Sequence, residues 1–280
     1  MPGPRIAALL LYPLKGGRGV ALDSARVDVT GLAAGAVADR RWMVVDRQGR
    51  FVSQRETPEL ALIVPALDGD ALRLTGRDGG PLSIDPARTP PHARDVVVWR
   101  DTVRAHDEGD EAARWITREL ARDARLVRFD ASLPRVCNPE FAGDSGAHTL
   151  FADAYPLLVI GSASLAHLNE RLARKGAAPL PMNRFRPNIV IDGLEPHVED
   201  RVATIAAGTS VLKPVKACTR CRVTTTDQAT AAVGREPLPT LAEYRYDARL
   251  AGVTFGMNAI VTKPGTLRVG DAVSSPAGNT

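Results

Sequence analysis

The chain has 280 residues, 44% hydrophobic and 24% charged, which is the composition of a globular protein with one large or two ordinary domains. Its net charge is +4, and the sequence has no block of consecutive basic residues. We therefore expect no nucleic-acid partner and favour a small anionic ligand. No run approaches about 18 uninterrupted apolar residues, so no membrane span is expected. The start lacks the basic region and cleavage site of a signal peptide, which predicts a cytoplasmic protein.

The first part of the chain is typical of a series of strands and turns. Apolar or alternating patterns predict strands at 5–14, 25–30, 71–84 and 94–107, and a hairpin at 40–54. Turns are expected at Gly49 and at Gly79-Gly80. This regular spacing predicts a barrel or a sandwich.

A helix and a long irregular segment follow. Residues 107–123 carry apolar side chains at helical spacing behind a run of acidic residues, which predicts a helix. Residues 125–130 form one more strand. Residues 131–150 have no period, and we interpret them as a long loop between domains or over a site.

The remaining chain alternates strands with two helices. Strands are predicted at 155–161, 186–193, 208–227 and 258–273, and the last is expected to hold a strand pair around Pro264-Gly265. A helix at 162–176 could be capped by Ser162 or Ser164 and ended by Gly176. A short helix fits 238–245. The predicted fold class is mainly β (α+β) in two parts, with a few helices.

Two of the chain's three cysteines, Cys218 and Cys221, lie three apart in "VKACTRCRVTTTD". A structural zinc site needs four ligands, and neither a second Cys pair nor a His pair supplies the missing half. A thioredoxin-like dithiol needs a helix after the pair, whereas "RVTTTD" favours a strand. In a strand the two side chains would face opposite sides, so one could be a ligand while the other packs.

From the residues alone, the pair is either two inert buried thiols or a reactive thiolate with a companion. Buried cysteines behave as small apolar residues. Basic neighbours stabilise a thiolate, and this pair has Lys213, Lys216, Arg220 and Arg222 around it. Both interpretations remain open at this point.

Several segments together resemble a known family. These segments are "LYPLKGGRG", "ADRRWMVVD", "FADAYPLLVI", "RFRPNIVIDG", "CTRCRVTTTD", "GREPLPTLAEYR" and "FGMNAIV". In this order they are similar to the MOSC-domain molybdenum enzymes with an N-terminal β-barrel, the family of the mitochondrial amidoxime-reducing component and its bacterial relatives. The resemblance implies an N-terminal MOSC β-barrel domain at 1–128 and a MOSC β-barrel domain at 129–280.

The resemblance also implies which residues hold the molybdenum cofactor. It makes Cys221 the molybdenum ligand, a role that suits a soft thiolate, with Cys218 as its packed neighbour. It makes Lys15, Arg40 and Arg186 the cationic contacts of the phosphate end. Gly16 stands where the family usually has serine, so one hydroxyl contact is expected to be lost.

Further positions match family residues near the cofactor. Asp153 corresponds to an acidic residue by the metal, where it could position a proton or a pterin nitrogen. The other matched contacts are Thr219, Arg220, Asn258 and Arg184. Without the family, Asp153 could equally form a turn. Lys15 could be solvated, and Arg40 and Arg186 could pair with Asp39 and Asp192.

The implied function is a molybdenum-dependent oxidoreductase that reduces N-hydroxylated compounds, namely hydroxylamines, amidoximes and N-hydroxylated base analogues. The sequence has neither a C-x₄-C-x₂-C run nor a Gly-rich flavin or nicotinamide fingerprint, so we expect a separate electron donor, ferredoxin-like or a flavoprotein reductase. We expect a monomer, and no pyridoxal phosphate. Two alternatives are a sulfur carrier with a persulfide on Cys221, and a non-catalytic module whose basic cleft binds a phosphate ligand.

Overall fold

The computed structural model describes residues 3–69 and 71–274, and its largest element is a nine-stranded sheet. Its strands lie in the order β2 (Val20–Leu22), β1 (Arg5–Leu11), β16 (Ile189–Asp192), β15 (Leu157–Gly161), β20 (Gly252–Lys263), β18 (Ser210–Thr219), β17 (Ile205–Ala207) and β22 (Val273–Ser274), with β19 (Tyr246–Asp247) paired to β20. Strands β15 and β16 run parallel, joined by a helical crossover. The first strand of the chain therefore lies in the sheet built mainly by its second half.

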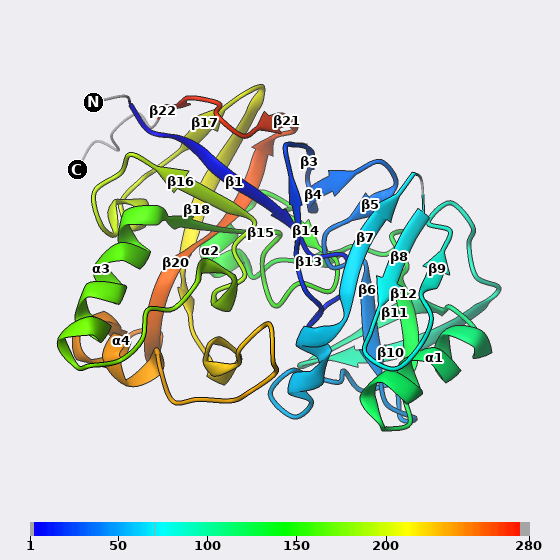
Figure 1. The fold of residues 1–280 in the computed structure, drawn as a ribbon. Helices are drawn as coiled ribbons and strands as arrows, with labels where there is room; N and C mark the ends of the chain where they lie inside the picture. Colours follow the sequence, from blue (N-terminus) through cyan, green and yellow to red (C-terminus); the bar gives the residue numbers. More distant parts are fainter. Residues whose placement is uncertain (1–2, 70, 275–280) are drawn as a thin grey trace.

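The N-terminal part builds smaller antiparallel sheets, on the right in Figure 1. One contains β10 (His92–Val98), β11 (Asp101–Asp107), β12 (Arg125–Phe129) and β6 (Trp42–Val45), and another β7 (Val64–Asp68), β8 (Ala71–Thr75) and β9 (Leu82–Ile84). A third contains β21 (Gly265–Arg268), β3 (Ser24–Asp28), β4 (Gly31–Ala34) and β5 (Val37–Ala38). Strands β13 (Arg135–Val136) and β14 (His148–Thr149) form a two-stranded sheet. The predicted mainly-β class is confirmed.

The helices are few and mostly short. They are α1 (Asp110–Leu120), α2 (Pro139–Ala142), α3 (Ser162–Arg174), α4 (Leu238–Arg245), and the 3-10 turns η1 (Pro58–Leu62), η2 (Met182–Arg184), η3 (Val198–Asp200) and η4 (Arg222–Thr225). The helix predicted at 107–123 is confirmed as α1, which buries Trp115, Ile116 and Leu120. The helix predicted at 238–245 has those bounds. In the described part of the chain, no helix is both long and apolar enough to cross a membrane.

One hydrophobic core joins the two parts. Its buried members come from β1, from the N-terminal sheets and from the large sheet, and include Leu11, Trp42, Leu60, Val159 and Ile189. Burying such side chains contributes roughly 1.5–3 kcal/mol each. The two parts therefore pack as one body, which fixes the relative position of loops that lie far apart in sequence.

The predicted cap of the helix at 162–176 is wrong. Gly161 precedes the first helical residue, and no side chain caps it. The Ser162 hydroxyl donates to Asp192 Oδ1 (2.8 Å) and the Ser164 hydroxyl donates to Glu199 Oε1 (2.6 Å), so both serines serve tertiary contacts instead. At the other end, Gly176 follows the helix with φ +70°, as predicted.

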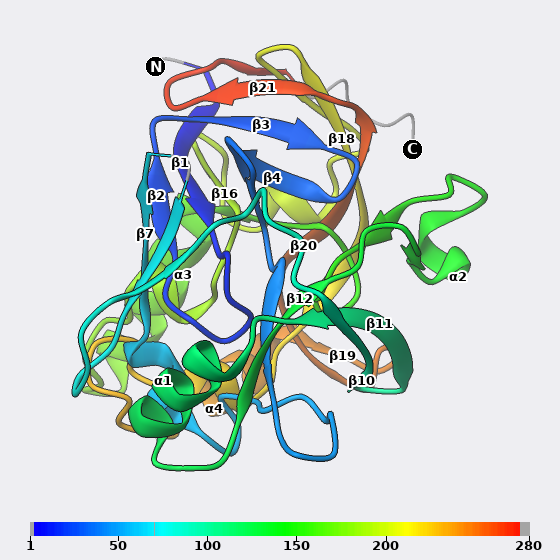
Figure 2. The same cartoon turned by 90° about the vertical axis from the view of Figure 1, so that its right-hand side faces the viewer.

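The strand pair predicted around Pro264-Gly265 is also wrong. Only Pro264 separates β20 from β21, and one residue is too few for a hairpin turn. Strand β21 instead pairs with β3, from Gly265 opposite Val27 to Arg268 opposite Ser24. Figure 2 shows β21 lying beside β3, so the chain's last strands return to its first.

Three other expectations met mixed outcomes. The turn at Gly49 is confirmed, with its N–H donating to Asp46 O (3.0 Å). The return arm of that hairpin makes a single bridge to β6, in which the Val52 N–H donates to Val44 O (2.9 Å), while the Phe51 N–H donates to Val97 O (2.9 Å) on the other side. The segment 131–150 is not one uninterrupted loop, since it contains β13, α2 and β14.

Candidate functional site

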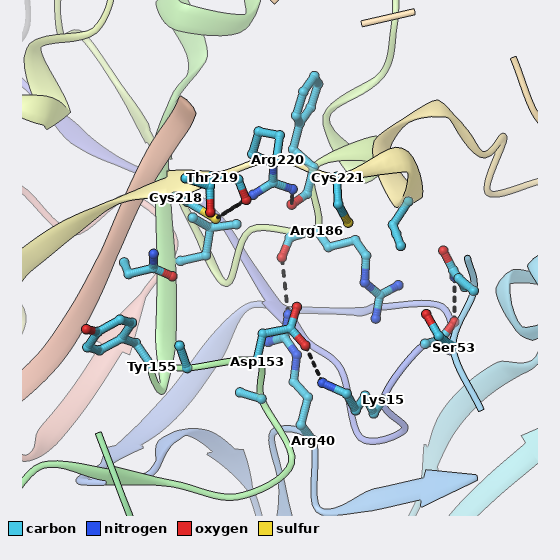
Figure 3. A pocket seen from close by; sticks show the side chains of 18 of the residues that line it. Lys15, Arg40, Ser53, Asp153, Tyr155, Arg186, Cys218, Thr219, Arg220 and Cys221 are labelled. Atoms are coloured by element: carbon cyan, nitrogen blue, oxygen red, sulfur yellow. Dashed lines mark hydrogen bonds and ion pairs between the residues drawn. The ribbon is translucent and has the colours of Figure 1, made fainter. Parts of the chain in front are cut away.

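A cleft between the two parts of the molecule brings together almost all the predicted site residues (Figure 3). It holds about 880 Å³ between protein atoms, including its open mouth. Its lining includes Lys15, Gly16, Arg40, Asp153, Arg186, Cys218, Thr219, Arg220, Cys221 and Asn258. Of the predicted set, only Arg184 is not part of this lining.

Lys15 lies at the base of the cleft, in the loop after β1. Its side chain is 6% exposed and forms an ion pair with Asp153. Its ammonium also lies 4.7 Å from the centre of the Phe51 ring and 5.7 Å from that of Trp99. The solvated alternative for Lys15 is therefore wrong. Burial lowers the pKa of Lys15, although Asp153 opposes this change.

Asp153 is the carboxylate of the cleft. Its Oδ1 accepts from Lys15 and, at 3.0 Å, from the indole N–H of Trp99. Burial of the site acts to raise the pKa of Asp153, but the Lys15 charge and both hydrogen bonds outweigh it and lower the pKa. Asp153 is therefore ionised at neutral pH, as an acceptor of protons and hydrogen bonds.

Arg40 and Arg186 flank the ring of buried Tyr12, 4.3 and 4.4 Å from its centre. Both have a left-handed backbone, with φ +48° and +56°. Non-glycine residues rarely adopt this conformation, and it concentrates at functional sites. With this backbone both guanidinium groups reach the Tyr12 ring, and both residues line the cleft.

The two arginines differ in how their charges are paired. Arg40 forms an ion pair with buried Asp39, which was the alternative role that the sequence suggested for it. It also donates to Asn188 Oδ1 (3.0 Å). Arg186 does not pair with Asp192, so that alternative is wrong. It donates through Nη1 to Gly17 O (2.6 Å) and weakly to Gln228. Among the described residues, its Nε and Nη2 have no acceptor.

The strand predicted to continue through "RVTTTD" ends at Thr219. Cys221 directly precedes the 3-10 turn η4. The hydroxyl of Thr224 donates to Cys221 O (2.9 Å) and that of Thr225 to Arg222 O (2.8 Å). Such local hydrogen bonds compete with strand pairing. The prediction of opposite faces therefore fails, and Cys218 and Cys221 line the same cleft.

The two thiols have different partners. Arg220 donates to Cys218 Sγ (2.8 Å) and to Phe185 O (2.7 Å), which ties Cys218 to the wall. Within the described residues, Cys221 Sγ has no hydrogen-bond partner, and Figure 3 shows it pointing toward the side of the cleft that holds Arg186. Cys221 is therefore the thiol available to a ligand.

The remaining predicted residues have structural partners. Arg184 donates to Thr225 O (2.9 Å) and Asp227 Oδ2 (3.0 Å), so it holds η4 in place behind the cleft. Asn258, on β20, donates to Lys216 O (3.3 Å). Gly16 has φ +85°, and a Cβ there would lie 3.2 Å from Leu60. A side chain at position 16 would be strained, which explains glycine in this loop.

Sequence reasoning missed the aromatic side chains of the cleft, Phe51 and Trp99, and Arg55, whose guanidinium lies over the Trp99 ring. Trp99 lies at the tip of the hairpin between β10 and β11, in a segment predicted as one strand at 94–107. The signal was present in "VVVWRDTVRA", where two β-branched runs flank a polar turn.

Comparison with known proteins finds matches to both parts of the chain. Residues 3–123 match the MOSC N-terminal beta barrel domain and residues 146–274 match the MOSC domain. The chain is 36% identical to mitochondrial amidoxime-reducing component 1 of Homo sapiens and 34% identical to mitochondrial amidoxime reducing component 2 of Bos taurus. It is 32% identical to component 1 of Danio rerio. Each alignment covers 96% of this chain, and 82%, 82% and 83% of the respective relative.

Proposed function

This chain belongs to the family of two-domain MOSC proteins that includes the mitochondrial amidoxime-reducing components, and on that premise we propose that it is a molybdenum-cofactor-dependent oxidoreductase that reduces N-hydroxylated compounds. We further propose that the domains divide near residues 128 and 129, between the two matched segments. The observation that carries the function is the position of Cys221, whose free thiol shares a cleft with Lys15, Arg40 and Arg186.

The donor set of the cleft fits the cofactor. Molybdopterin presents a phosphate and dithiolene sulfurs, so its site must supply cations at one end and a soft ligand at the other. The unused Nε and Nη2 of Arg186 supply the first, with Lys15 and Arg40 beside them. Arg220 Nε is buried without a partner in the described structure, so the cleft holds a further unused donor.

In this proposal Cys221 ligates the metal, and the bound cofactor supplies the two-electron redox chemistry. Arg220 holds Cys218 against the wall, so one sulfur and not two faces the metal position. Burial lowers the pKa of Arg186 to about 10, so its guanidinium still carries its charge at neutral pH and can bind phosphate.

The protons for the reaction come from the chain's own groups or from water. Reduction of an N–OH group to N–H consumes two electrons and two protons and releases water. Asp153 is ionised at neutral pH, so it orients an N–H or O–H donor and does not act as the acid. Lys15 carries a proton at Nζ against Asp153 Oδ1, and its lowered pKa makes that proton easier to release.

We propose that the two electrons come from a separate protein, ferredoxin-like or a flavoprotein reductase. A plant-type iron–sulfur cluster needs four cysteine ligands, and this sequence has three cysteines, of which Cys137 is buried. The cytoplasmic location and the monomeric state stay predictions.

An assay with reduced viologen and benzamidoxime tests the function without the natural donor. The native protein should form benzamidine. Cys221→Ser should abolish turnover, while the matched Cys218→Ser should keep most of it, because Cys218 lies against the wall. Equal loss in both variants, or no turnover by molybdenum-loaded native protein, contradicts the proposal.

The sulfur-carrier alternative makes the opposite prediction for the same protein. A sulfur carrier would transfer sulfur to an acceptor without any metal. The mass of the protein would rise by one sulfur atom, carried on Cys221. Mass spectrometry of the native protein beside Cys221→Ser separates the two. No specific contact in the cleft favours a persulfide over a metal.

A further inference from the structure

Trp99 adopts a conformation that its residue type disfavours. It lies at the tip of the β10–β11 hairpin with φ +59°, where a bulky side chain is a backbone outlier. Its side chain is 40% exposed, yet it lines the mouth of the cleft. Strain of this kind persists only where surrounding contacts fix the residue, and it clusters at functional sites.

Three contacts fix the orientation of the Trp99 ring. Its indole N–H donates to Asp153 Oδ1 (3.0 Å). The Phe51 ring meets it edge-on, at 5.4 Å between centres and 78° between planes. The guanidinium of Arg55 lies 4.4 Å from the ring centre. Trp99 is still 40% exposed with these contacts in place, so the part of the ring that Arg55 does not cover is open to a ligand at the mouth.

A free hydrogen-bond acceptor adjoins this surface. Asp153 Oδ1 accepts from both Lys15 and Trp99, whereas Oδ2 has no donor among the described residues. Oδ1 is therefore occupied and Oδ2 is open, and Lys15 alone still holds Oδ1 when the indole N–H is removed. An amidoxime has N–H and O–H donors that such an oxygen can accept.

We propose that Trp99 is a substrate-positioning residue that makes this chain prefer N-hydroxylated groups carried on an aromatic ring. The aromatic part of the substrate stacks on the indole, and the N-hydroxylated head donates to Asp153 Oδ2. An aliphatic substrate has the same head but no π-face, so it gains nothing from Trp99. This inference rests on the proposed function and adds a specificity determinant to it.

Benzamidoxime and acetamidoxime form a matched pair of probes, because they share the head and differ in the ring. In Trp99→Gly, glycine accepts the left-handed backbone, so the hairpin should stay folded. We expect KM for benzamidoxime to rise about tenfold, kcat to change less than twofold, and KM for acetamidoxime to stay within about twofold. Trp99→Phe should restore most of the benzamidoxime affinity, because it restores an aromatic face.

A control and a binding measurement complete the test. Tyr246→Ala removes another exposed aromatic side chain, outside the cleft, and should change neither KM. Benzamidoxime should quench the fluorescence of native protein but not of Trp99→Gly, because Trp42 and Trp115 are buried. Equal KM changes for both probes, or none, would overturn the role of Trp99. Failure of the native protein to reduce either probe would instead sink the proposed function.

Discussion

Two arginines, one buried and one half-buried, show what separates a structural site from a candidate active site. Arg128, in the N-terminal part, donates to Glu108 through Nε (2.8 Å) and Nη2 (3.1 Å). Its remaining donors reach the carbonyls of Asp85, Pro86 and Arg88. Arg186, in the cleft, uses only Nη1. One guanidinium is saturated by the protein, while the other keeps donors for a ligand.

The carboxylates follow the same division. Glu108 is 2% exposed, and it accepts from Trp42 Nε1 (2.6 Å) as well as from Arg128. Asp153 is 70% exposed and keeps Oδ2 open. A buried charge is tolerated when its hydrogen bonds are complete. Incomplete hydrogen bonding in a cation-rich cleft therefore indicates a place where a polar ligand completes them.

The largest expected effect is on the free energy of unfolding, when the buried pair of Arg128 and Glu108 is broken. Arg128→Met leaves Glu108 buried without its partner, so the free energy of unfolding should fall by about 3–5 kcal/mol. Urea unfolding followed by circular dichroism measures this. Arg47→Met, which breaks the exposed pair with Asp123, is the control and should cost at most about 1 kcal/mol. A similar small loss in both variants would remove the contrast between the two sites.

A smaller effect is expected at Arg186, and it should appear in the retention of the cofactor and not in the stability of the protein. Arg186→Gln removes charge-assisted bonds to a phosphate, worth about 1.5–3 kcal/mol, so retention of the cofactor should weaken about tenfold to a hundredfold. The free energy of unfolding of the cofactor-free protein should change by less than about 1 kcal/mol. Pterin fluorescence after dialysis measures retention. Arg26→Gln, at an exposed pair with Asp28, should retain cofactor like the native protein.

The smallest expected effect concerns the titration of Asp153. Its pKa is lowered on folding, so the pair with Lys15 stabilises the protein above about pH 4 and loses this contribution as pH falls through the folded-state pKa. Lys15→Met removes the main charge and a hydrogen bond that lower this pKa, so the pKa of Asp153 should rise toward the ordinary value of a carboxyl group. Carboxyl NMR detects the change. Lys175→Met, which breaks the pair with Glu243, should leave Asp153 unchanged; a pKa that stays low in Lys15→Met would show that Lys15 is not the cause.

The sequence correctly predicted the helices and strands whose formation depends on neighbouring residues. The helix α1 and the buried strand β15 follow from periodicity and composition, which act within a few residues. The turn η4 was missed because hydrogen bonds from Thr224 and Thr225 decide it, and the β propensity of these residues points the other way. The pairing of β21 with β3 joins segments more than 200 residues apart, which no local pattern encodes.

The site shows the same limit. The resemblance to a family indicated the residues that the fold then brings into one cleft, from Lys15 to Asn258. It could not show that Lys15 pairs with Asp153, 138 residues away, nor that Arg184 is engaged by Asp227. Trp99 was missed because no local pattern shows that the tip of its hairpin reaches Asp153, 54 residues away.

The proposed function requires the Cys221 sulfur to bind molybdenum, and elemental analysis of three purified proteins measures this. The native protein and Cys218→Ser should each contain close to one molybdenum per chain, while Cys221→Ser should contain at most a small fraction. Native protein isolated from a molybdenum-replete host without the metal, or Cys221→Ser with a full complement, would contradict the account.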